Sequence, residues 1–422
     1  MNILVIGASG MIGSHVHAAL QAAGHRVIGA SRRRPEGAGE WFELDFTVMQ
    51  RAENWLPRLQ GIDAVVNCVG ILREARPGDF DLLHRDVPIA LFAACAQLGI
   101  RKVVQVSALG SGLQAATPYW RSKGAAEADL LARDFGTVIR ASLVYGPNGA
   151  SSRVFRLLAT LPFIMMPLAS GAKVQPIHVD DLTEAVLRLL AMDRPPREIA
   201  VVGPRAMSMA EYLRTLRQAM RAPCGIVLDM PMPLARLAAR IGQLIPASAL
   251  TPDALTMLEV SRNGSNTADA REVTALLGRA PRDPASFASP DQRSAAVAAW
   301  AIPAIRVAFA LLWLLTAWTS WFGWPHAESH VWLAACGVPE VWRESTLLAA
   351  SLLDAGIGLA LLLTRTQWIW PLQIAVVGTY TLIMSVCLPQ FWLHPFGVLG
   401  KNIPLLVMMF VMWRLEPQAV SK

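Results

Sequence analysis

Charged residues are scarce in this chain, and the scarcity is local. Lys, Arg, Asp and Glu make up 16% of the 422 residues, against about 25% in an average soluble domain. Eleven of the 14 tryptophans fall at Trp300 or later. Between residues 307 and 413 only seven residues carry a charge, namely Glu328, Glu340, Arg343, Glu344, Asp354, Arg365 and Lys401. The shortage therefore divides the chain into an ordinary polar part and an apolar, tryptophan-rich part.

Cysteine pairs and nucleic-acid-binding segments are also lacking. The five cysteines, at positions 68, 95, 224, 336 and 387, form no CxxC pair, so we expect neither a metal site nor a disulfide framework. Reduced thiols are typical of a cytoplasmic domain. The apolar run at residues 2–6 ends at Gly7, too soon for a signal peptide, so none is expected. The net charge of +7 is explained by basic residues on the cytoplasmic side of a membrane and by residues that bind nucleotide phosphates. Because the chain has no basic-aromatic segments, nucleic acid is not an expected partner.

The first thirty residues carry the most specific motif. Residues 2–6 are an apolar run typical of a strand buried on both faces of a parallel sheet. A glycine-rich turn follows, and a helix is predicted from His15 to Ala23, with Gly24 at its end. Such glycines let the backbone approach a pyrophosphate, and the helix N-terminus supplies N–H groups for that anion. We therefore predict a dinucleotide site that includes Gly7, Ser9, Gly10, Met11, Ile12 and Gly13.

The GxxGxxG spacing resembles the short-chain dehydrogenase/reductase (SDR) superfamily, in its extended or atypical branches. This resemblance covers residues 1 to about 290 and implies an α/β fold, a doubly wound parallel Rossmann sheet with a small substrate-side subdomain. After the second predicted strand, Arg32-Arg-Arg34 replaces the acid of NAD-type members. Guanidinium groups suit a 2′-phosphate, so NADP(H) is preferred while NAD(H) stays possible; solvated loop charges are the alternative. The resemblance implies further cofactor contacts at Ser31, Arg32, Arg33, Asp45, Phe46, Cys68, Val69, Gly70 and Leu143.

Ser107, Tyr119 and Lys123 are the candidate catalytic residues, and the last two also border the cofactor. Ser107 follows the strand predicted at residues 102–106, on the sheet edge where ligands collect. The i,i+4 spacing puts Tyr119 and Lys123 on one face of the next helix. The resemblance implies a YxxxK pair: the lysine lowers the tyrosine pKa, the tyrosine exchanges a proton with a substrate oxygen, and the serine positions that oxygen. Ser111 is an alternative serine.

The segments after this helix are less specific. In residues 174–182 we expect Asp180 and Asp181 to cap a helix, and His178 to have a structural rather than a catalytic role. Residues 223–261 are interpreted as a substrate-side cap or an amphipathic segment, with Thr251 as a helix N-cap. Residues 281–290 hold three prolines and are predicted to be a linker. The expected domains are therefore residues 1–222, 223–290 and 300–416.

Three apolar runs predict membrane crossings, at residues 307–324, 345–364 and 367–388. At 1.5 Å per residue each is long enough, or nearly so, for a core of about 30 Å. Residues 403–413 cross only if the helix extends back to about Leu393. Four crossings bring both termini to one side, and we expect the inner membrane with the nucleotide domain in the cytoplasm. A buried soluble bundle is the alternative.

This part resembles the DoxX-like family of four-helix membrane proteins, at residues 311–320, 352–358 and 394–405. The resemblance permits a link to quinone chemistry. Asp354 lies inside a predicted span, where a charge is costly, so we expect a functional or a pairing role, with His394 and Lys401 as candidate partners. A purely structural role between helices is the alternative.

Together these features predict a membrane-anchored NADP(H)-dependent oxidoreductase of the SDR type. Its substrate is expected to be a small molecule with a carbonyl or alcohol group, either lipophilic or sugar-like, and the lipid bilayer is the other expected partner. The alternative is a non-catalytic NADPH-binding structural, assembly or sensor protein, because atypical SDR members include the accessory subunit of mitochondrial complex I. The sequence leaves the oligomeric state open.

Overall fold

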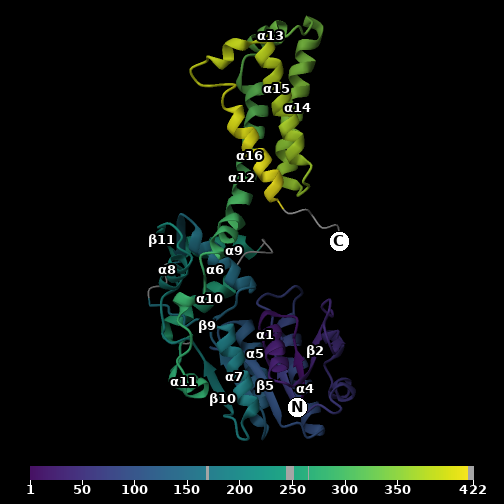
Figure 1. Ribbon diagram of the computed structural model, residues 1–422, viewed down its shortest axis with the longest axis vertical. Helices are drawn as coiled ribbons and strands as arrows, with labels where there is room; N and C mark the ends of the chain where they lie inside the picture. Colours follow the sequence, from purple (N-terminus) through teal and green to yellow (C-terminus); the bar gives the residue numbers. More distant parts are fainter. Residues whose placement is uncertain (168–170, 244–250, 265, 417–422) are drawn as a thin grey trace. The chain divides into compact units, whose positions relative to one another are not determined.

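The chain divides into two compact units, Met1–Ala296 and Val297–Lys422. The structure is a computed structural model and describes residues 1–167, 171–243, 251–264 and 266–416. In Figure 1 the first unit contains strands flanked by helices, and the second contains helices alone. The expected change from an α/β fold to an apolar helical region is thus confirmed.

Seven parallel strands form the main sheet of the first unit, in the order β10-β6-β5-β4-β1-β2-β3. The strand order reverses between β1 and β4, and ligands bind at such a switch point in doubly wound sheets. Short β-branched and apolar runs form the central strands because both of their faces are covered. The strands are β1 (Asn2–Ile6), β2 (Arg26–Ser31), β3 (Trp41–Glu43), β4 (Ala64–Asn67), β5 (Lys102–Ala108), β6 (Thr137–Ala141) and β10 (Glu198–Val201).

Helices cover both faces of this sheet because successive side chains along a strand point to opposite sides. Ile3 and Val5 of β1 belong to one core, whereas Leu4 and Ile6 belong to the other. The first core includes α1 (Met11–Ala22), α7 (Val179–Ala191) and α11 (Arg271–Leu277). The second includes α2 (Ala52–Trp55), α4 (Val87–Gln97) and α5 (Pro118–Ala132). Between β4 and α4 lie α3 (Asp79–Asp81) and the π-helical turn η3 (Leu82–Asp86).

A smaller subdomain packs around its own core. Here β8 (Phe163–Pro167) pairs in parallel with β11 (Ile226–Met230), and α6 (Ala150–Thr160) packs on α8 (Met209–Ala219). The short strands β7 (Val144–Tyr145) and β9 (Ile177–His178) form a separate pair. Residues 223–260 contribute β11, α9 (Met232–Gln243) and α10 (Pro252–Val260), while residues 244–250 of that stretch lie outside the described residues. The predicted N-cap is confirmed, since the Thr251 hydroxyl accepts a hydrogen bond from the Ala254 amide at 3.1 Å.

Two local predictions were wrong. The N-cap of α7 is His178, whose ring accepts from the Asp180 amide at 3.3 Å, which also confirms a structural role for this histidine. Asp181 is instead fully buried and accepts hydrogen bonds from Arg279 and Arg282, both at 2.7 Å. Residues 281–290 are no free linker, because Phe287 is buried in the subdomain core. Periodicity along one segment carries no information about such partners from distant segments.

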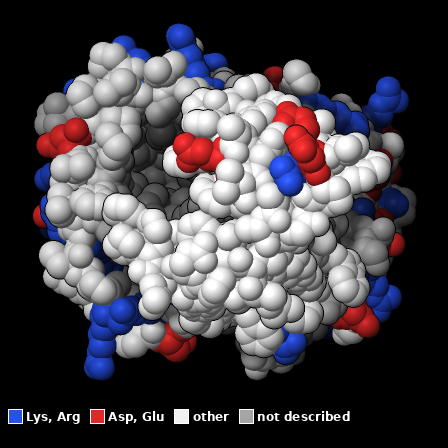
Figure 2. All heavy atoms as spheres, turned by 90° about the horizontal axis from the view of Figure 1, so that it is seen from above, with Lys and Arg blue, Asp and Glu red and all other residues white. Residues whose placement is uncertain are grey.

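Three helices of the second unit are long and apolar enough to cross a membrane, judged by length and composition among the described residues. They are α12 (Gln292–Trp318, continued by the π-helical turn η6, Thr319–Gly323), α14 (Glu340–Leu363) and α15 (Ile369–Cys387). Two shorter helices are α13 (His326–Ala335) and α16 (Asn402–Leu415). Because α16 begins at Asn402, the extension back to about Leu393, on which a full fourth crossing depended, is not present. In Figure 2 the C-terminal helices present a mostly white surface with few charged side chains.

An ion pair ties four of these helices together at one end. Arg306 of α12 lies 2.6 Å from the Glu416 carboxylate, which follows α16. The Arg306 Nε–H also donates to the Leu361 carbonyl of α14 at 2.7 Å. The Trp370 indole N–H of α15 donates to Glu416 at 2.6 Å. The chain therefore leaves α16 at the end of the bundle where Arg306 lies.

Candidate active site

The glycine-rich turn after β1 has the geometry of an anion cradle. Gly7 has a φ of +77°, which a side chain would disfavour. A Cβ atom at Gly13 would lie 2.2 Å from the Gly7 carbonyl oxygen, so only glycine lets α1 approach the turn. Gly10 caps α1 without a side-chain hydrogen bond, and the first turn of α1 holds no acid. The N-terminal amides of α1 can therefore serve a diphosphate, and these residues fit a dinucleotide.

The residues that follow β2 include three arginines and no acid, while the Glu43 carboxylate of the neighbouring β3 accepts from the Arg34 amide at 3.1 Å. The buried Ser31 hydroxyl donates to the Arg33 carbonyl at 2.7 Å and accepts from the Trp41 indole at 3.1 Å. The Arg34 guanidinium is already hydrogen-bonded, because it donates to the carbonyls of Ala38 and Gly39. Arg32 and Arg33 are exposed, and neither forms an ion pair with the described residues. Two guanidinium groups thus remain accessible beside the expected adenosine ribose.

Asp45 and Phe46 follow β3 and have different surroundings. The exposed Asp45 carboxylate accepts from the Thr47 amide at 2.9 Å and from its hydroxyl at 2.7 Å. These hydrogen bonds lower the pKa of Asp45. Phe46 is buried in the sheet core. Asp45 is therefore an ionised, locally ordered acceptor, as a contact to an adenine amino group requires.

The residues after β4 lie directly against the glycine turn. A Cβ atom at Gly7 would lie 3.0 Å from the Cys68 carbonyl carbon and 3.0 Å from the Val69 nitrogen. At Gly70 it would lie 3.5 Å from the Lys123 Nζ atom. Burial raises the pKa of the Cys68 thiol to about 12, so this thiol stays protonated. The structure thus brings two predicted cofactor segments and the candidate lysine to one edge of the sheet.

Tyr119 and Lys123 lie side by side, as their i,i+4 spacing predicts. Both come from α5, which starts at Pro118 after the Thr117 N-cap. The Lys123 Nζ atom is 5.7 Å from the centre of the Tyr119 ring and donates to the Val106 carbonyl at 3.4 Å. Lys123 is buried, and this burial lowers its pKa to about 8, against an opposing effect of Glu127. Burial also raises the pKa of Tyr119, so its hydroxyl is protonated at neutral pH.

Ser107 lies at this edge, but a buried carboxylate engages its hydroxyl. Both Ser107 and Ser111, the alternative serine, donate to the same oxygen of Glu127. Glu127 is 1% exposed, and its other oxygen lies 2.9 Å from the Arg140 guanidinium. The expected contact from Ser107 to a substrate oxygen would therefore compete with this carboxylate. The sequence interpretation missed Glu127, although its position four residues after Lys123 on the same helix was a usable signal.

His84 is a second residue that the sequence interpretation missed. Its Nε2 accepts from the Ile71 amide at 3.0 Å, so the neutral ring carries its proton on Nδ1 and donates to the Ser122 hydroxyl at 3.1 Å. Ser122 in turn donates to the Tyr119 carbonyl at 3.0 Å. Burial, helped by the nearby Lys123 charge, lowers the pKa of His84 to about 2. No motif marks this histidine, because its partners come from segments 13 and 38 residues away.

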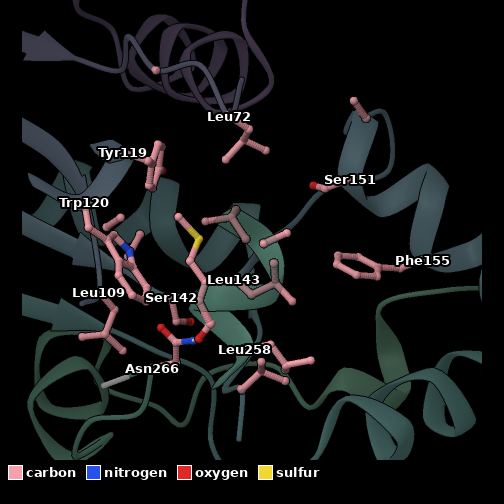
Figure 3. A pocket seen from close by; sticks show the side chains of 18 of the residues that line it. Leu72, Leu109, Tyr119, Trp120, Ser142, Leu143, Ser151, Phe155, Leu258 and Asn266 are labelled. Carbon is pink, nitrogen blue, oxygen red and sulfur yellow. The ribbon is translucent and has the colours of Figure 1, made fainter. Parts of the chain in front are cut away.

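A cavity of about 930 Å³ joins these groups. It is lined by Gly10, Cys68, Gly70, Ser107, Tyr119 and Lys123 and extends to Leu143, Phe155 and Leu258. Figure 3 shows Tyr119 and Trp120 on one side of the cavity and Phe155 on the other, with Leu143 between them. Clefts of this size and concavity are typical of small-molecule sites. The arrangement has the parts needed to bind a dinucleotide and to move a proton at the Tyr119 oxygen.

The three predicted polar residues of the second unit are not paired with one another. Asp354 of α14 is buried, and its Oδ1 atom has no hydrogen-bond partner among the described residues. His394 accepts through Nδ1 from the Phe396 amide at 3.3 Å. Lys401 is exposed at the start of α16. The sequence interpretation missed the ion pair of this unit between the buried Arg306 and the half-buried Glu416.

Two family models match separate parts of the chain. The NAD dependent epimerase/dehydratase family matches residues 3–203, and a DoxX-like family matches residues 310–410. The chain is 31% identical over 229 residues to the mitochondrial protein FMP52 of Eremothecium gossypii, covering 51% of this chain and 100% of that protein. It is 25% identical over 198 residues to subunit 9 of the NADH dehydrogenase [ubiquinone] 1 alpha subcomplex of Rattus norvegicus, covering 43% of this chain and 51% of the rat protein.

A solved structure shares the fold of the first unit. The structure of MoeE5 in complex with UDP-glucose and NAD superposes with a TM-score of 0.51 at 22% identity, covering 70% of this chain and 99% of MoeE5. Identity this low supports the fold alone. The match agrees with the parallel Rossmann-like sheet of the first unit.

Proposed function

We propose a function on the premise that this chain belongs to the NAD dependent epimerase/dehydratase family, through residues 3–203, and carries a DoxX-like domain over residues 310–410. On that premise it is a membrane-anchored oxidoreductase of the SDR type that reduces a carbonyl or oxidises an alcohol. The observation that carries the proposal is the adjacency of Tyr119, Lys123 and the glycine turn in one cavity.

The residues divide the work as follows. A bound nicotinamide dinucleotide would supply or accept the hydride. Gly7, Gly10 and Gly13 would leave room for its diphosphate against the amides of α1. The Tyr119 hydroxyl would donate its proton to the substrate oxygen during reduction and recover it from solvent. The Lys123 ammonium would hydrogen-bond the nicotinamide ribose and favour the ionised tyrosine as that proton leaves.

The decisive test of catalysis is Tyr119→Phe in the full chain, purified in detergent. We expect oxidation of NADPH in the presence of carbonyl substrates to fall by roughly 100-fold or more, the usual effect of losing a general acid. The dissociation constant for NADPH should change little, since the change removes one hydroxyl and leaves Lys123 and the glycine turn in place. Equal turnover in wild type and Tyr119→Phe would remove Tyr119 from the reaction.

For the cofactor, we propose NADP(H) rather than NAD(H). The support is the pair of exposed guanidinium groups, Arg32 and Arg33, at a β2 end that holds no acid. A charge-assisted contact contributes about 1.5–3 kcal/mol, or roughly 10- to 100-fold in affinity. The double change of Arg32 and Arg33 to Ala should therefore weaken NADPH by that factor and leave NADH unchanged. Arg34→Ala is the matched control, because its guanidinium is bound to loop carbonyls. An equal loss for both cofactors would contradict the assignment.

A non-catalytic NADPH-binding role is the second candidate. It is favoured by one feature of the site, the engagement of Ser107 and Ser111 by Glu127, which leaves the expected serine tied to the protein. In this case Tyr119→Phe and Lys123→Ala would keep biological function, whereas Gly10→Asp would abolish it by placing a carboxylate where the diphosphate binds. Complementation of a deletion strain by these three variants separates the two proposals.

A further inference from the structure

The cavity beside Tyr119 has one polar end and a long apolar remainder. Its polar end holds Tyr119, Lys123 and Gly70, and its volume of about 930 Å³ is near the upper limit for small-molecule sites. A nicotinamide ring at the polar end leaves the rest for a substrate. That remainder is lined mainly by Leu143, Phe155, Leu158, Met166, Leu213 and Leu258. Figure 3 shows Leu143, Phe155 and Leu258 around the open space opposite Tyr119.

Three polar side chains that line this remainder already bond to the protein, which leaves the Ser151 hydroxyl and the Trp120 indole as the other uncharged polar groups among the described lining residues outside the cofactor end. Gln175 donates to the Gly203 carbonyl at 2.8 Å and accepts from the Ala268 amide at 3.0 Å. The Ser142 hydroxyl donates to the Gln175 carbonyl, and Asn266 donates to the Met257 carbonyl at 3.4 Å. A sugar brought into the cavity would therefore exchange hydration of its hydroxyls for few hydrogen bonds, which is unfavourable.

Positive charge is also concentrated away from this remainder. Arg73 and Lys123 are the cationic residues among the described residues that line the cavity. Lys123 is buried at the cofactor end, bonded to the Val106 carbonyl. Arg73 already interacts with another group of the protein. A nucleotide-linked substrate carries two further phosphates, and such groups normally bind to arginine, lysine or helix amides.

We infer that the cavity binds an apolar, chain-like carbonyl or alcohol, and that nucleotide-linked sugars are excluded. The reacting oxygen would lie toward Tyr119 and the apolar chain toward α6 (Leu158) and α10 (Leu258). This inference rests on the proposed function for the reacting end, while the apolar chain site rests on the lining alone. Each buried methylene should raise affinity roughly fourfold until the cavity is filled.

The test is photo-crosslinking of the full chain in lipid nanodiscs with NADPH present, with a diazirine analogue of farnesol as probe. We expect labelled peptides from residues 143–166 and 252–260, detected by mass spectrometry. Unlabelled farnesol should compete, and UDP-glucose at the same concentration should not. Labelling confined to residues 297–416, or displacement of the probe by UDP-glucose, would overturn the inference.

Two variants of Leu258 test the apolar lining directly. Leu258→Glu places a charge in the lining and should reduce labelling of the first unit at least fivefold; Leu258→Gln, a milder change, should reduce it less. Leu113→Glu is the matched control, because Leu113 is exposed and outside the lining. Retained NADPH binding shows that each variant is folded. Unchanged labelling in both Leu258 variants would contradict the apolar site.

The same experiment separates this inference from the proposed catalysis. Tyr119→Phe should keep the labelling, since the chain site does not depend on proton transfer. Labelling without turnover in the wild type, assayed both as farnesol oxidation with NADP+ and as reduction of the corresponding aldehyde with NADPH, would preserve the binding inference and end the enzymatic proposal. Turnover of UDP-glucose without labelling would overturn the binding inference and preserve the enzymatic proposal.

Discussion

At the scale of single residues, the candidate site contains two buried charged groups, Lys123 and Glu127, that do not form an ion pair with each other. Lys123 is enclosed, and burial lowers its pKa to about 8, while Glu127 acts in the opposite direction. Glu127 is shared between Arg140 and two serine hydroxyls, so it cannot act as a dedicated partner of the lysine. The histidine beside them is neutral, because burial lowers the pKa of His84 to about 2. Lys123 is thus the group in this cluster whose charge changes near physiological pH.

The pKa of Lys123 predicts how cofactor binding depends on pH. Lys123 is charged below about pH 8 and neutral above it, so its hydrogen bond to the cofactor should be present below that value and weaken above it. We expect the dissociation constant for NADPH to rise roughly tenfold between pH 7 and pH 9.5, the value of one charge-assisted hydrogen bond. Fluorescence titration with NADPH measures this dissociation constant at each pH.

Lys123→Arg provides the matching variant for this prediction. Arginine stays charged throughout the tested pH range, so the step near pH 8 should disappear even if overall affinity is lower. If the dissociation constant for NADPH still rose near pH 8 in Lys123→Arg, the rise would have to come from the titration of another group.

At the scale of elements, the turn between β1 and α1 is fixed by close approach. The first turn of α1 packs on the Gly7 carbonyl, and the Gly7 backbone packs on the residues after β4. The contact at Gly13 leaves no space for a Cβ atom, and the contact at Gly7 leaves little, so the strand order of the sheet is coupled to the shape of the turn. The glycines in this motif therefore occur where backbone segments approach one another closely in the fold.

Gly13→Ala tests this packing directly. The added Cβ atom would lie 2.2 Å from the Gly7 oxygen, so α1 must shift away from the turn. Overpacking of this kind costs about 1–3 kcal/mol, and we expect NADPH affinity to fall roughly 5- to 150-fold. Isothermal titration on the full chain measures the loss, and a lower melting temperature should accompany it.

Gly39→Ala is the control for the element prediction. A Cβ atom at Gly39 would meet only the flexible Gln21 amide, at 3.9 Å. Its NADPH affinity and melting temperature should match those of the wild type. If Gly13→Ala behaved like Gly39→Ala, the close approach of α1 would not be needed for binding.

At the scale of the whole molecule, a polar unit with a Rossmann-like sheet is joined to an apolar helical one. The ion pair between Arg306 and Glu416 lies where α12, α14, α15 and α16 meet, which puts the first and last helices of the bundle at one end. α16 has 14 residues, or about 21 Å at 1.5 Å per residue, and is short for a full crossing. The ion pair nevertheless requires the chain to return to the end where it entered.

The shared end predicts the membrane topology. A reporter fused at the C-terminus should lie on the same side as the nucleotide-binding unit, and one inserted at residues 394–397 should lie on the opposite side. Paired alkaline phosphatase and green fluorescent protein fusions measure these positions in cells. Both reporters on the same side would mean that α16 does not cross.

The sequence by itself determined the features that local chemistry dictates. Short apolar strands, the glycine turn, the Tyr119 and Lys123 spacing and the three long apolar helices all follow from patterns within a few residues of one another. These patterns depend on backbone geometry and helical periodicity, which act locally. They were sufficient for the fold class and the two-part organisation, and they led to the proposed place of the cofactor.

Only the tertiary structure decided which distant groups meet. It placed Glu127 on Ser107, His84 against Ile71 and Ser122, Asp181 beneath the arginines of residues 279–282, and Arg306 beside Glu416. It also gave the cavity an apolar lining drawn from α6, α8 and α10, where we propose that the substrate binds. Such contacts join segments up to 110 residues apart, and they form because burial forces polar groups to find partners wherever the fold brings them together.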